Sequence, residues 1–292
     1  MMDVRRLVLL RDLAEYQTVT AVADVHHVTA SAVSQQLRAL EAEVGKPLLL
    51  REGRTVRLTS AGRALARRCE DVLAALERAS AEVNELAGTI DGELAVGCFT
   101  SGFPAVAMPM AETLLARHPQ LKFRFLEGEP EETIPMLRQR RLDLVVAYRY
   151  RHLGTELQPG LVSLPVCDDP FLICVPERLR DVVETDGLAA LREQPWVTFP
   201  VGSCREANVH AARTAGFTPR QAHVTASIPV ALDMVAAGMG VTMMPAMAAR
   251  DAPPGVALLP TAGLHRKIEV VVRAGTERQP IIAAALEALS LS

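Results

Sequence analysis

The chain has 292 residues, of which 49% are hydrophobic and 22% charged; these values are ordinary for a globular protein and allow two or three domains. No apolar run reaches the roughly 18 residues that a membrane-spanning helix needs. The segment from Met1 to Arg6 lacks the long apolar core and cleavage site of a signal peptide, so we expect a cytoplasmic protein that does not contact a membrane.

Charge is distributed unevenly along the chain. Residues 1–68 hold 11 Lys and Arg against 7 Asp and Glu, a balance of +4. The remainder holds 20 basic against 27 acidic residues, a balance of −7, and the whole chain carries −3. A basic N-terminal unit joined to a larger acidic one suits a protein whose N-terminal part contacts a phosphate backbone.

Cysteine and histidine give no pattern typical of a metal or redox centre. The five cysteines are far apart in the chain: Cys69, Cys98, Cys167, Cys174 and Cys204. None forms C-x-x-C, and an odd number argues against a disulfide framework. We interpret them as small buried thiols, with a redox sensor or a metal site as the alternative. The adjacent pair His26-His27 is poorly placed to hold one metal ion, because neighbouring helix residues do not face each other. We predict no metal and no cofactor.

Three helices are predicted near the N-terminus, each preceded by a capping residue. Asp3 can cap the first, Thr20 a short second helix over 21–26, and Thr29 a third over 30–44. Apolar residues recur along the third helix at the spacing of a buried stripe: Val33, Leu37, Leu40 and Val44. Two short helices separated by a tight turn, the second polar on its outer face, indicate a helix-turn-helix.

A β-hairpin is predicted next. Two short apolar-rich runs flank Glu52-Gly53-Arg54, and the glycine can supply the positive φ of a tight turn. Arg51, Arg54 and Arg57 lie along this hairpin, which would form a wing beside the helix-turn-helix.

A long helix then begins at Thr59 or Ser60. Its apolar positions alternate in steps of four and three: Leu65, Cys69, Val72, Leu76, Ala79, Val83, Leu86 and Ile90. This heptad pattern predicts a helix that pairs with a second helix. The alternative is one amphipathic helix packed on its own domain.

From Asp91-Gly92 onward, strand-like and helix-like runs alternate, which predicts largely parallel sheets covered by helices. The predicted strands are 94–99, 121–126, 142–147, 171–175, 196–199, 222–225, 241–244 and 268–272. The predicted helices are 104–117, 131–140, 188–192, 205–215, 230–237 and 280–289. The Gly-x-Gly at Gly238 to Gly240 follows a helix and precedes a strand, the reverse of the dinucleotide-binding order.

One stretch of sequence resembles a known family. The run from Thr18 to Glu41, with Val44-Gly45-Lys46-Pro47-Leu48, Arg51 and Leu58-Thr59-Ser60-Ala61-Gly62, is similar to the signature of LysR-type transcriptional regulators. The family usually has Gly where this chain has Gln17, and Phe where it has Leu49. These departures leave the expected fold intact and the operator sequence open.

The resemblance implies an architecture that is α/β overall. It implies a winged helix-turn-helix over 1–59, a coiled-coil linker helix over 60–90, and a two-lobed effector domain over 91–292 built like a periplasmic binding protein. Lobe one would hold 91–163 and 268–292, and lobe two 164–267. The run from Val235 to Pro245 matches the family's helix, Gly-x-Gly, strand and Pro element in the second lobe.

Residues on the outer face of the third helix and on the wing are the candidate DNA contacts: Thr29, Ala30, Ser31, Ser34, Gln35, Arg38, Arg51, Arg54 and Thr55. Short residues at the start of the helix let it enter the major groove, where Gln35 can pair with adenine through two hydrogen bonds. Arg38 and the wing residues suit phosphate or minor-groove contacts. The alternative for each residue alone is a solvated surface.

Candidate effector contacts lie where strands end, because helix N-termini there offer free N–H groups to a ligand. They are Thr100 and Ser101 after the first strand of the effector domain, Tyr148 and Arg149 after the third, and Ser203 later in the chain. We expect a small polar or anionic effector. The hydroxyl residues can alternatively be helix caps, and Arg149 can alternatively form a surface ion pair.

Together these features predict a bacterial regulator that binds an interrupted inverted repeat at promoters and responds to a small molecule in the cleft between the lobes. The expected partners are double-stranded DNA, a second copy in a homodimer or homotetramer, and RNA polymerase. The expected dimer interface is formed by Leu65, Val72, Leu76, Val83 and Leu86. No catalytic motif is found, so an enzyme is not expected; a transport binding protein would lack a helix-turn-helix.

Overall fold

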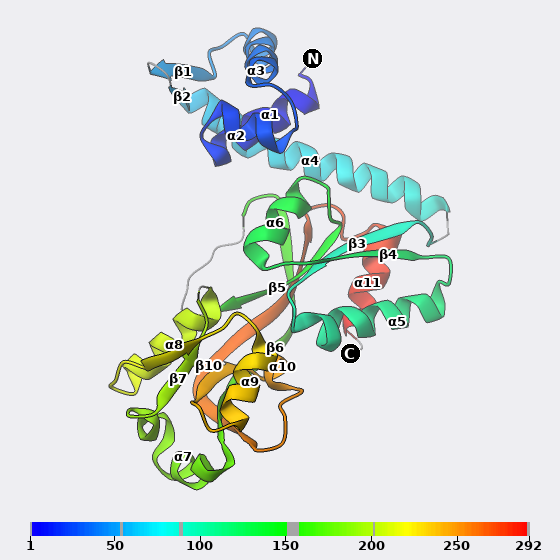
Figure 1. Cartoon of the computed structure of the whole chain (residues 1–292). Helices are drawn as coiled ribbons and strands as arrows, with labels where there is room; N and C mark the ends of the chain where they lie inside the picture. Colours follow the sequence, from blue (N-terminus) through cyan, green and yellow to red (C-terminus); the bar gives the residue numbers. More distant parts are fainter. Residues whose placement is uncertain (1, 53–54, 88–89, 151–157, 201, 291–292) are drawn as a thin grey trace. The chain divides into compact units, whose positions relative to one another are not determined.

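A computed structural model describes residues 2–52, 55–87, 90–150, 158–200 and 202–290. The chain divides into two compact units, which we describe separately (Figure 1). The first unit comprises Met1–Thr89, Leu157–Val162 and Arg273–Ala283, and the second comprises Ile90–Glu156, Ser163–Val272 and Ala284–Ser292. No helix in the described part of the chain is both long and apolar enough to cross a membrane.

The first unit begins with three helices and a hairpin and continues into one long helix. These elements are α1 (Val4–Tyr16), α2 (Val19–Val25), α3 (Ala30–Val44), β1 (Leu49–Glu52), β2 (Thr55–Leu58) and α4 (Ser60–Ala87). Asp3 caps α1 and Thr29 caps α3 as the sequence predicts, by accepting hydrogen bonds from backbone N–H groups of the first turn. The cap of α2 is Thr18 rather than Thr20, because this helix begins earlier than expected and Thr20 lies inside it.

The core of this unit joins the helix-turn-helix to the start of α4. Leu10 of α1, Val22 of α2 and Leu40 of α3 are fully buried in it. Leu65 of α4 packs against the same cluster. Leu65 is therefore partly buried against the N-terminal core, whereas the other expected dimer residues are exposed.

The remainder of α4 presents large apolar side chains to solvent. Val72, Leu76, Val83 and Leu86 have exposed fractions of 38%, 47%, 68% and 89%. On the same helix Glu77 is buried and accepts hydrogen bonds from Arg273 and Gln279, which belong to the same compact unit. One face of α4 is thus held by polar contacts, while its apolar face is uncovered.

The second unit is built on a six-stranded sheet in the order β4-β3-β5-β10-β6-β9. Its strands are β3 (Glu93–Cys98), β4 (Lys122–Glu127), β5 (Leu144–Tyr150), β6 (Leu161–Pro176), β9 (Thr242–Pro245) and β10 (Val256–Arg273). The pairs β3–β4 and β3–β5 are parallel, but β10–β5 and β6–β9 are antiparallel. The prediction of largely parallel sheets is therefore wrong for the middle of this sheet.

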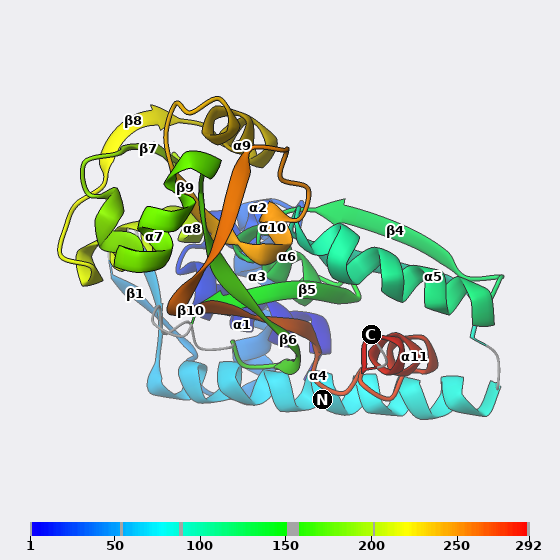
Figure 2. The same ribbon diagram turned by 90° about the horizontal axis from the view of Figure 1, so that it is seen from below.

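Two strands are far longer than predicted. β6 has 16 residues and β10 has 18, where the sequence predicted five residues each. Figure 2 shows β10 running from the neighbourhood of β9 and α9 to β5. The lobe built on β3, β4 and β5 (lobe one) and the lobe that contains β9 (lobe two) therefore share these two strands.

Helices and a second, two-stranded parallel sheet complete the unit. Strands β7 (Pro195–Thr198) and β8 (Arg220–Val224) pair in lobe two, and Trp196 forms an isolated bridge to Val241 beside β9. The helical elements are η1 (Phe103–Ala107), α5 (Met108–Arg117), α6 (Pro130–Arg138), η2 (Glu177–Leu179), α7 (Arg180–Asp186), η3 (Gly187–Leu191), α8 (Ser203–Thr214), α9 (Ile228–Ala236), α10 (Ala246–Ala249) and α11 (Pro280–Ser290). The sequence predicted neither α7 nor α10. The core of lobe two surrounds Phe171 and Trp196, both fully buried.

Candidate DNA-binding surface and effector site

The outer face of α3 carries polar side chains that point to solvent. Thr29, Ser31, Gln35 and Arg38 are exposed, as is Ala30, and Ser34 is half-buried. Thr29 already accepts the Ala32 N–H and shares a hydrogen bond with Ser31, whereas Gln35 and Arg38 make no side-chain hydrogen bond within the described residues. A polar face with uncommitted donors is what base and phosphate recognition in a major groove requires.

Contacts behind α3 fix its position. Arg6 of α1 donates a hydrogen bond to Gln36 and forms an ion pair with Glu43. Glu41 accepts hydrogen bonds from the backbone N–H groups of Leu48 and Leu49, at 2.8 and 3.0 Å, and so ties the end of α3 to the start of the hairpin. The sequence analysis did not assign these positioning roles.

A buried polar cluster lies beneath the helix-turn-helix. Asp12 of α1 is 2% exposed and lies 2.6 Å from the Nε2 atom of His26, at the end of α2. Arg11 pairs with the same carboxylate at 2.7 Å. Neither His26 nor its neighbour belongs to a metal-binding group: no cluster of three or more His, Cys, Asp or Glu that could hold a metal ion occurs among the described residues.

Close packing explains one residue of the signature. A Cβ atom at Gly62 would lie 2.2 Å from the carbonyl oxygen of Leu48, so only glycine fits where α4 crosses the start of the hairpin. The hairpin pairs Arg51 with Val56 and Glu52 with Thr55. The side chains of Arg51 and Thr55 lie outside the described part of the structure, and so does all of Arg54.

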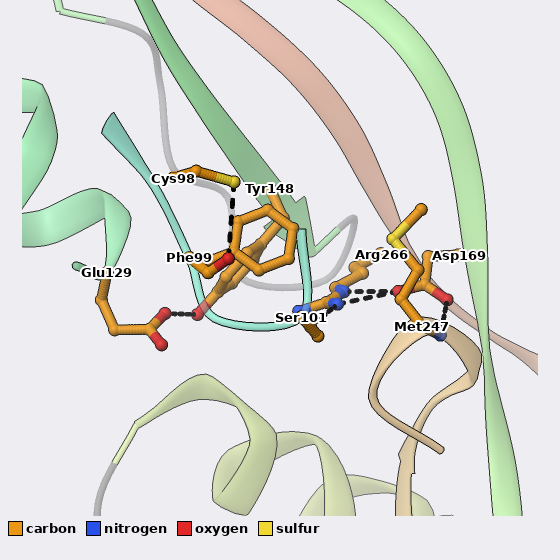
Figure 3. A network of polar contacts seen from close by, with 8 residues as sticks. All are labelled: Cys98, Phe99, Ser101, Glu129, Tyr148, Asp169, Met247 and Arg266. Atoms are coloured by element: carbon orange, nitrogen blue, oxygen red, sulfur yellow. Dashed lines mark hydrogen bonds and ion pairs between the residues drawn. The ribbon is translucent and has the colours of Figure 1, made fainter. Parts of the chain in front are cut away.

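In the second unit, the guanidinium of Arg266 on β10 connects the two lobes. Its Nε and Nη2 atoms lie 2.9 and 2.8 Å from Asp169 on β6, and Nη2 also donates to the hydroxyl of Ser101, which follows β3 (Figure 3). Asp169 accepts a further hydrogen bond from the N–H of Met247 in α10. Ser101, Asp169 and Arg266 are all buried. We call this set of contacts the Arg266 network.

Two aromatic rings enclose the same guanidinium. The Cζ atom of Arg266 lies 4.5 Å from the ring centre of Phe99 and 4.8 Å from that of Tyr148. The two rings meet edge to face, with their centres 4.9 Å apart. Cation–π contacts of this kind stabilise a partly desolvated arginine. The hydrogen bonds that Arg266 makes to the described residues use Nε and Nη2 only, which leaves Nη1 for another acceptor.

Two exposed carboxylates border the network in lobe one. The hydroxyl of Tyr148 donates to Glu129, and the hydroxyl of Thr100 donates to Glu127, each at 2.5 Å. Among the sequence-predicted residues, the structure therefore brings Thr100, Ser101 and Tyr148 together.

Arg149 does not join them. It forms a 2.6 Å ion pair with Glu269 on β10, and side-chain alternation along β5 directs it to the opposite face from Tyr148. The cation that meets Ser101 is Arg266. Sequence reasoning missed it because it lies between His265 and Lys267, in a charged stretch outside the strand predicted there. Ser203 is the first residue of α8, but its side chain is not described.

Three thiols of the second unit have a raised pKa; Cys98 and Cys174 are buried and Cys204 is half-buried. Burial raises the pKa of Cys98, Cys174 and Cys204 to about 12 in each case. For Cys98 and Cys204, the charge of Arg266 opposes this rise and that of Glu129 adds to it, so both charges lie near both thiols. At neutral pH these thiols are protonated and poor nucleophiles.

Comparison with known families agrees with this organisation. Residues 4–63 match the bacterial regulatory helix-turn-helix protein family of lysR type, and residues 87–291 match the LysR substrate binding domain. The chain belongs to the LysR family. This LysR-type protein is a DNA-binding transcriptional regulator with an effector-binding domain, and not an enzyme.

Individual relatives have low sequence identity to this chain but match it over most of its length. The uncharacterized HTH-type transcriptional regulator YcgK of Bacillus subtilis (strain 168) is 27% identical over 284 residues, which cover 88% of this chain and 84% of the relative. A hydrogen peroxide-inducible genes activator of Escherichia coli O6:H1 is 27% identical over 252 residues, with 85% and 80% covered. The crystal structure of full-length CbnR complexed with its target DNA shares the fold, with a TM-score of 0.55, 23% identity, and 99% and 98% of the chains covered.

Proposed function

We propose that this LysR-type regulator binds an interrupted inverted repeat at promoters as a homodimer or homotetramer, and that a small molecule bound between the two lobes changes its action there. The observation that carries the proposal is the exposed face of α3, where Gln35 and Arg38 have no partner among the described residues. Arg6 and Glu41 hold α3 in place. The side chains of Gln35 and Arg38 are therefore available to contact the bases and phosphates of an operator.

The uncovered face of α4 supports self-association. Val83 and Leu86 are 68% and 89% exposed although they continue the heptad spacing of Val72 and Leu76. A second α4 packed against these four residues would bury them. Two copies joined in this way would present two α3 helices, as an inverted repeat requires.

The Arg266 network supports the effector role. It joins Ser101 of lobe one to Asp169 and Met247 of lobe two. A ligand that binds the free Nη1 edge of Arg266 would therefore alter the contacts that connect the lobes. If the lobes can adopt two arrangements, a ligand shifts the equilibrium between them only to the extent that it binds one arrangement more tightly than the other.

The name of the Escherichia coli relative states a peroxide response for that protein; in this chain the thiols of Cys98 and Cys204 are poorly suited to one. Reaction with peroxide requires a thiolate. Burial holds the pKa of Cys98 and Cys204 at about 12, so neither thiol ionises near neutral pH.

Footprinting of the full-length protein on its own genomic DNA tests the DNA-binding proposal. We expect protection of two half-sites on one face of the duplex, with affinity falling steeply as salt rises, because phosphate contacts release counterions. Absence of any protected promoter site at low salt would exclude this function.

A further inference from the structure

We propose that the effector of this regulator is a zwitterion, a small molecule whose carboxylate binds Arg266 and whose protonated amine binds Glu127 and Glu129. The inference rests on the proposed function, because it assumes that the effector binds beside the Arg266 network. It narrows the polar or anionic effector expected from the sequence to a molecule that carries both charges.

The first argument is the balance of charge. Arg266 is paired with Asp169, so the ion pair itself is neutral. Glu127 and Glu129 add two carboxylates that the described hydrogen bonds connect to Thr100 and Tyr148, which are not cations. A plain anion would meet a site of net negative charge and be repelled. A ligand that brings its own positive charge would be attracted.

The second argument is that a carboxylate still has donors to meet. Nη1 of Arg266 is not used by the described residues, and Arg266 is only 5% exposed, so a hydrogen bond to it would be shielded from water.

The third argument is the spacing of the two charges. Figure 3 shows Glu129, Tyr148 and Arg266 in succession: the Tyr148 hydroxyl donates to Glu129, and its ring lies against the guanidinium. One tyrosine side chain thus separates the acidic from the basic end. This separation suits a molecule in which a few carbon atoms lie between the amine and the carboxylate, as in amino acids.

The test uses the full-length protein, thermal-shift screening and calorimetry. The probes are the twenty L-amino acids, β-alanine and γ-aminobutyrate, each beside its N-acetyl derivative and its carboxamide. We expect at least one free amino acid to raise the Tm, and both of its derivatives to bind about ten- to a hundredfold more weakly, because each has lost one charge-assisted hydrogen bond.

Substitutions locate the amine. Glu127→Gln should weaken binding of the free amino acid by about tenfold or more. The same substitution should hardly change the affinity for the N-acetyl derivative, because that derivative has no protonated amine for Glu127 to bind. Glu129→Gln should behave in the same way. Glu131→Gln is the matched control, because Glu131 is an exposed acid in the first turn of α6 that has no side-chain hydrogen bond or ion pair with the network among the described residues.

The outcomes separate the two proposals. If an N-acetyl derivative binds as tightly as the free amino acid, or if Glu127→Gln tightens binding, the effector is a simple anion; the zwitterion proposal is then wrong and the effector site stands. If no free amino acid binds, the zwitterion proposal is also wrong. Footprinting of the operator decides the DNA-binding function independently of either result.

Discussion

Arg266 and Asp169 form a 2.8 Å ion pair in which the side chains are only 6% and 1% exposed. Removing one member of a buried pair leaves an uncompensated charge, so Asp169→Ala should lower the free energy of unfolding by about 3–5 kcal/mol. Urea denaturation measures this loss. The double variant Asp169→Leu with Arg266→Met leaves no buried charge. Its loss of unfolding free energy should therefore be smaller than the sum of the losses measured for Asp169→Leu alone and Arg266→Met alone. Additive losses would contradict a coupled pair.

Base recognition by α3 is tested with Gln35→Ala. Loss of a bidentate contact should reduce discrimination between the operator and a sequence altered at one base pair by about 1–3 kcal/mol. Competition gel shifts at fixed salt give this difference. Arg51→Ala is the comparison, since a phosphate contact should weaken binding to all sequences alike and reduce the salt dependence. If the Gln35→Ala protein keeps its specificity, the bases are recognised by residues other than Gln35.

Assembly through α4 is tested with Val83→Asp combined with Leu76→Asp. Both positions are exposed in the single chain, so the fold should survive, whereas a dimer would bury two unpaired charges per chain at a cost of several kcal/mol. Sedimentation should show monomers at concentrations where the unaltered protein self-associates. Asn84→Asp adds a charge at a neighbouring exposed position outside the heptad seam and should leave assembly unchanged.

Alkaline pH should destabilise the effector domain through three thiols whose pKa is raised by burial. Cys98, Cys174 and Cys204 have a pKa of about 12 in the folded chain against 9.0 for an ordinary thiol. Below pH 9 the thiols are protonated in both states and their contribution to stability is fully present. Above pH 9 the unfolded chain ionises first, so each thiol lowers stability by up to ~1.4 kcal/mol per pH unit until the pH reaches the folded value.

Comparison with the triple Cys→Ala protein isolates this effect from other titrations. The difference in unfolding free energy between the two proteins should shrink between pH 9 and 11. A constant difference would mean that the thiols ionise normally in the folded state.

Backbone strain at Gln17 predicts a stabilising substitution. Gln17 ends α1 in the left-handed region, with φ at 60°, at the position where the family usually has glycine. A residue with a Cβ atom is strained there, so Gln17→Gly should raise the free energy of unfolding by up to ~1 kcal/mol. Gln17→Ala, which keeps the Cβ atom, is the control and should bring no gain.

Local rules predicted the N-terminal unit well. The bounds of α3 were predicted from the cap Thr29 and the spacing of Val33, Leu37 and Leu40, and the structure has the same bounds. Each of these signals lies within a few residues of the element it defines. The long helix was also predicted from local spacing. Its first apolar residues, Leu65 and Cys69, pack in the core of its own unit.

Prediction was poorest where distant segments meet. Strands β6 and β10 extend through polar stretches such as Cys167 to Asp169 and His265 to Lys267, where neither alternation nor apolar content indicates a strand. The Arg266 network joins residues up to 165 positions apart in the chain. Thr100 and Ser101 could be placed beside the network because the end of β3 is recognisable in the sequence. Tyr148 was predicted to follow a strand but lies within β5, and Arg266 lies within β10 and is identified only by its three-dimensional neighbours.

The continuity of β10 has a consequence for how the effector domain unfolds. Residues 266–272 of this strand form backbone hydrogen bonds with β5 in lobe one, and the same strand extends without interruption into lobe two beside β6. Because both lobes contain part of this strand, neither lobe can be removed without cutting it. Amide protons of β5 and of β9 should therefore exchange with solvent through one shared cooperative opening, and both lobes should melt in a single transition.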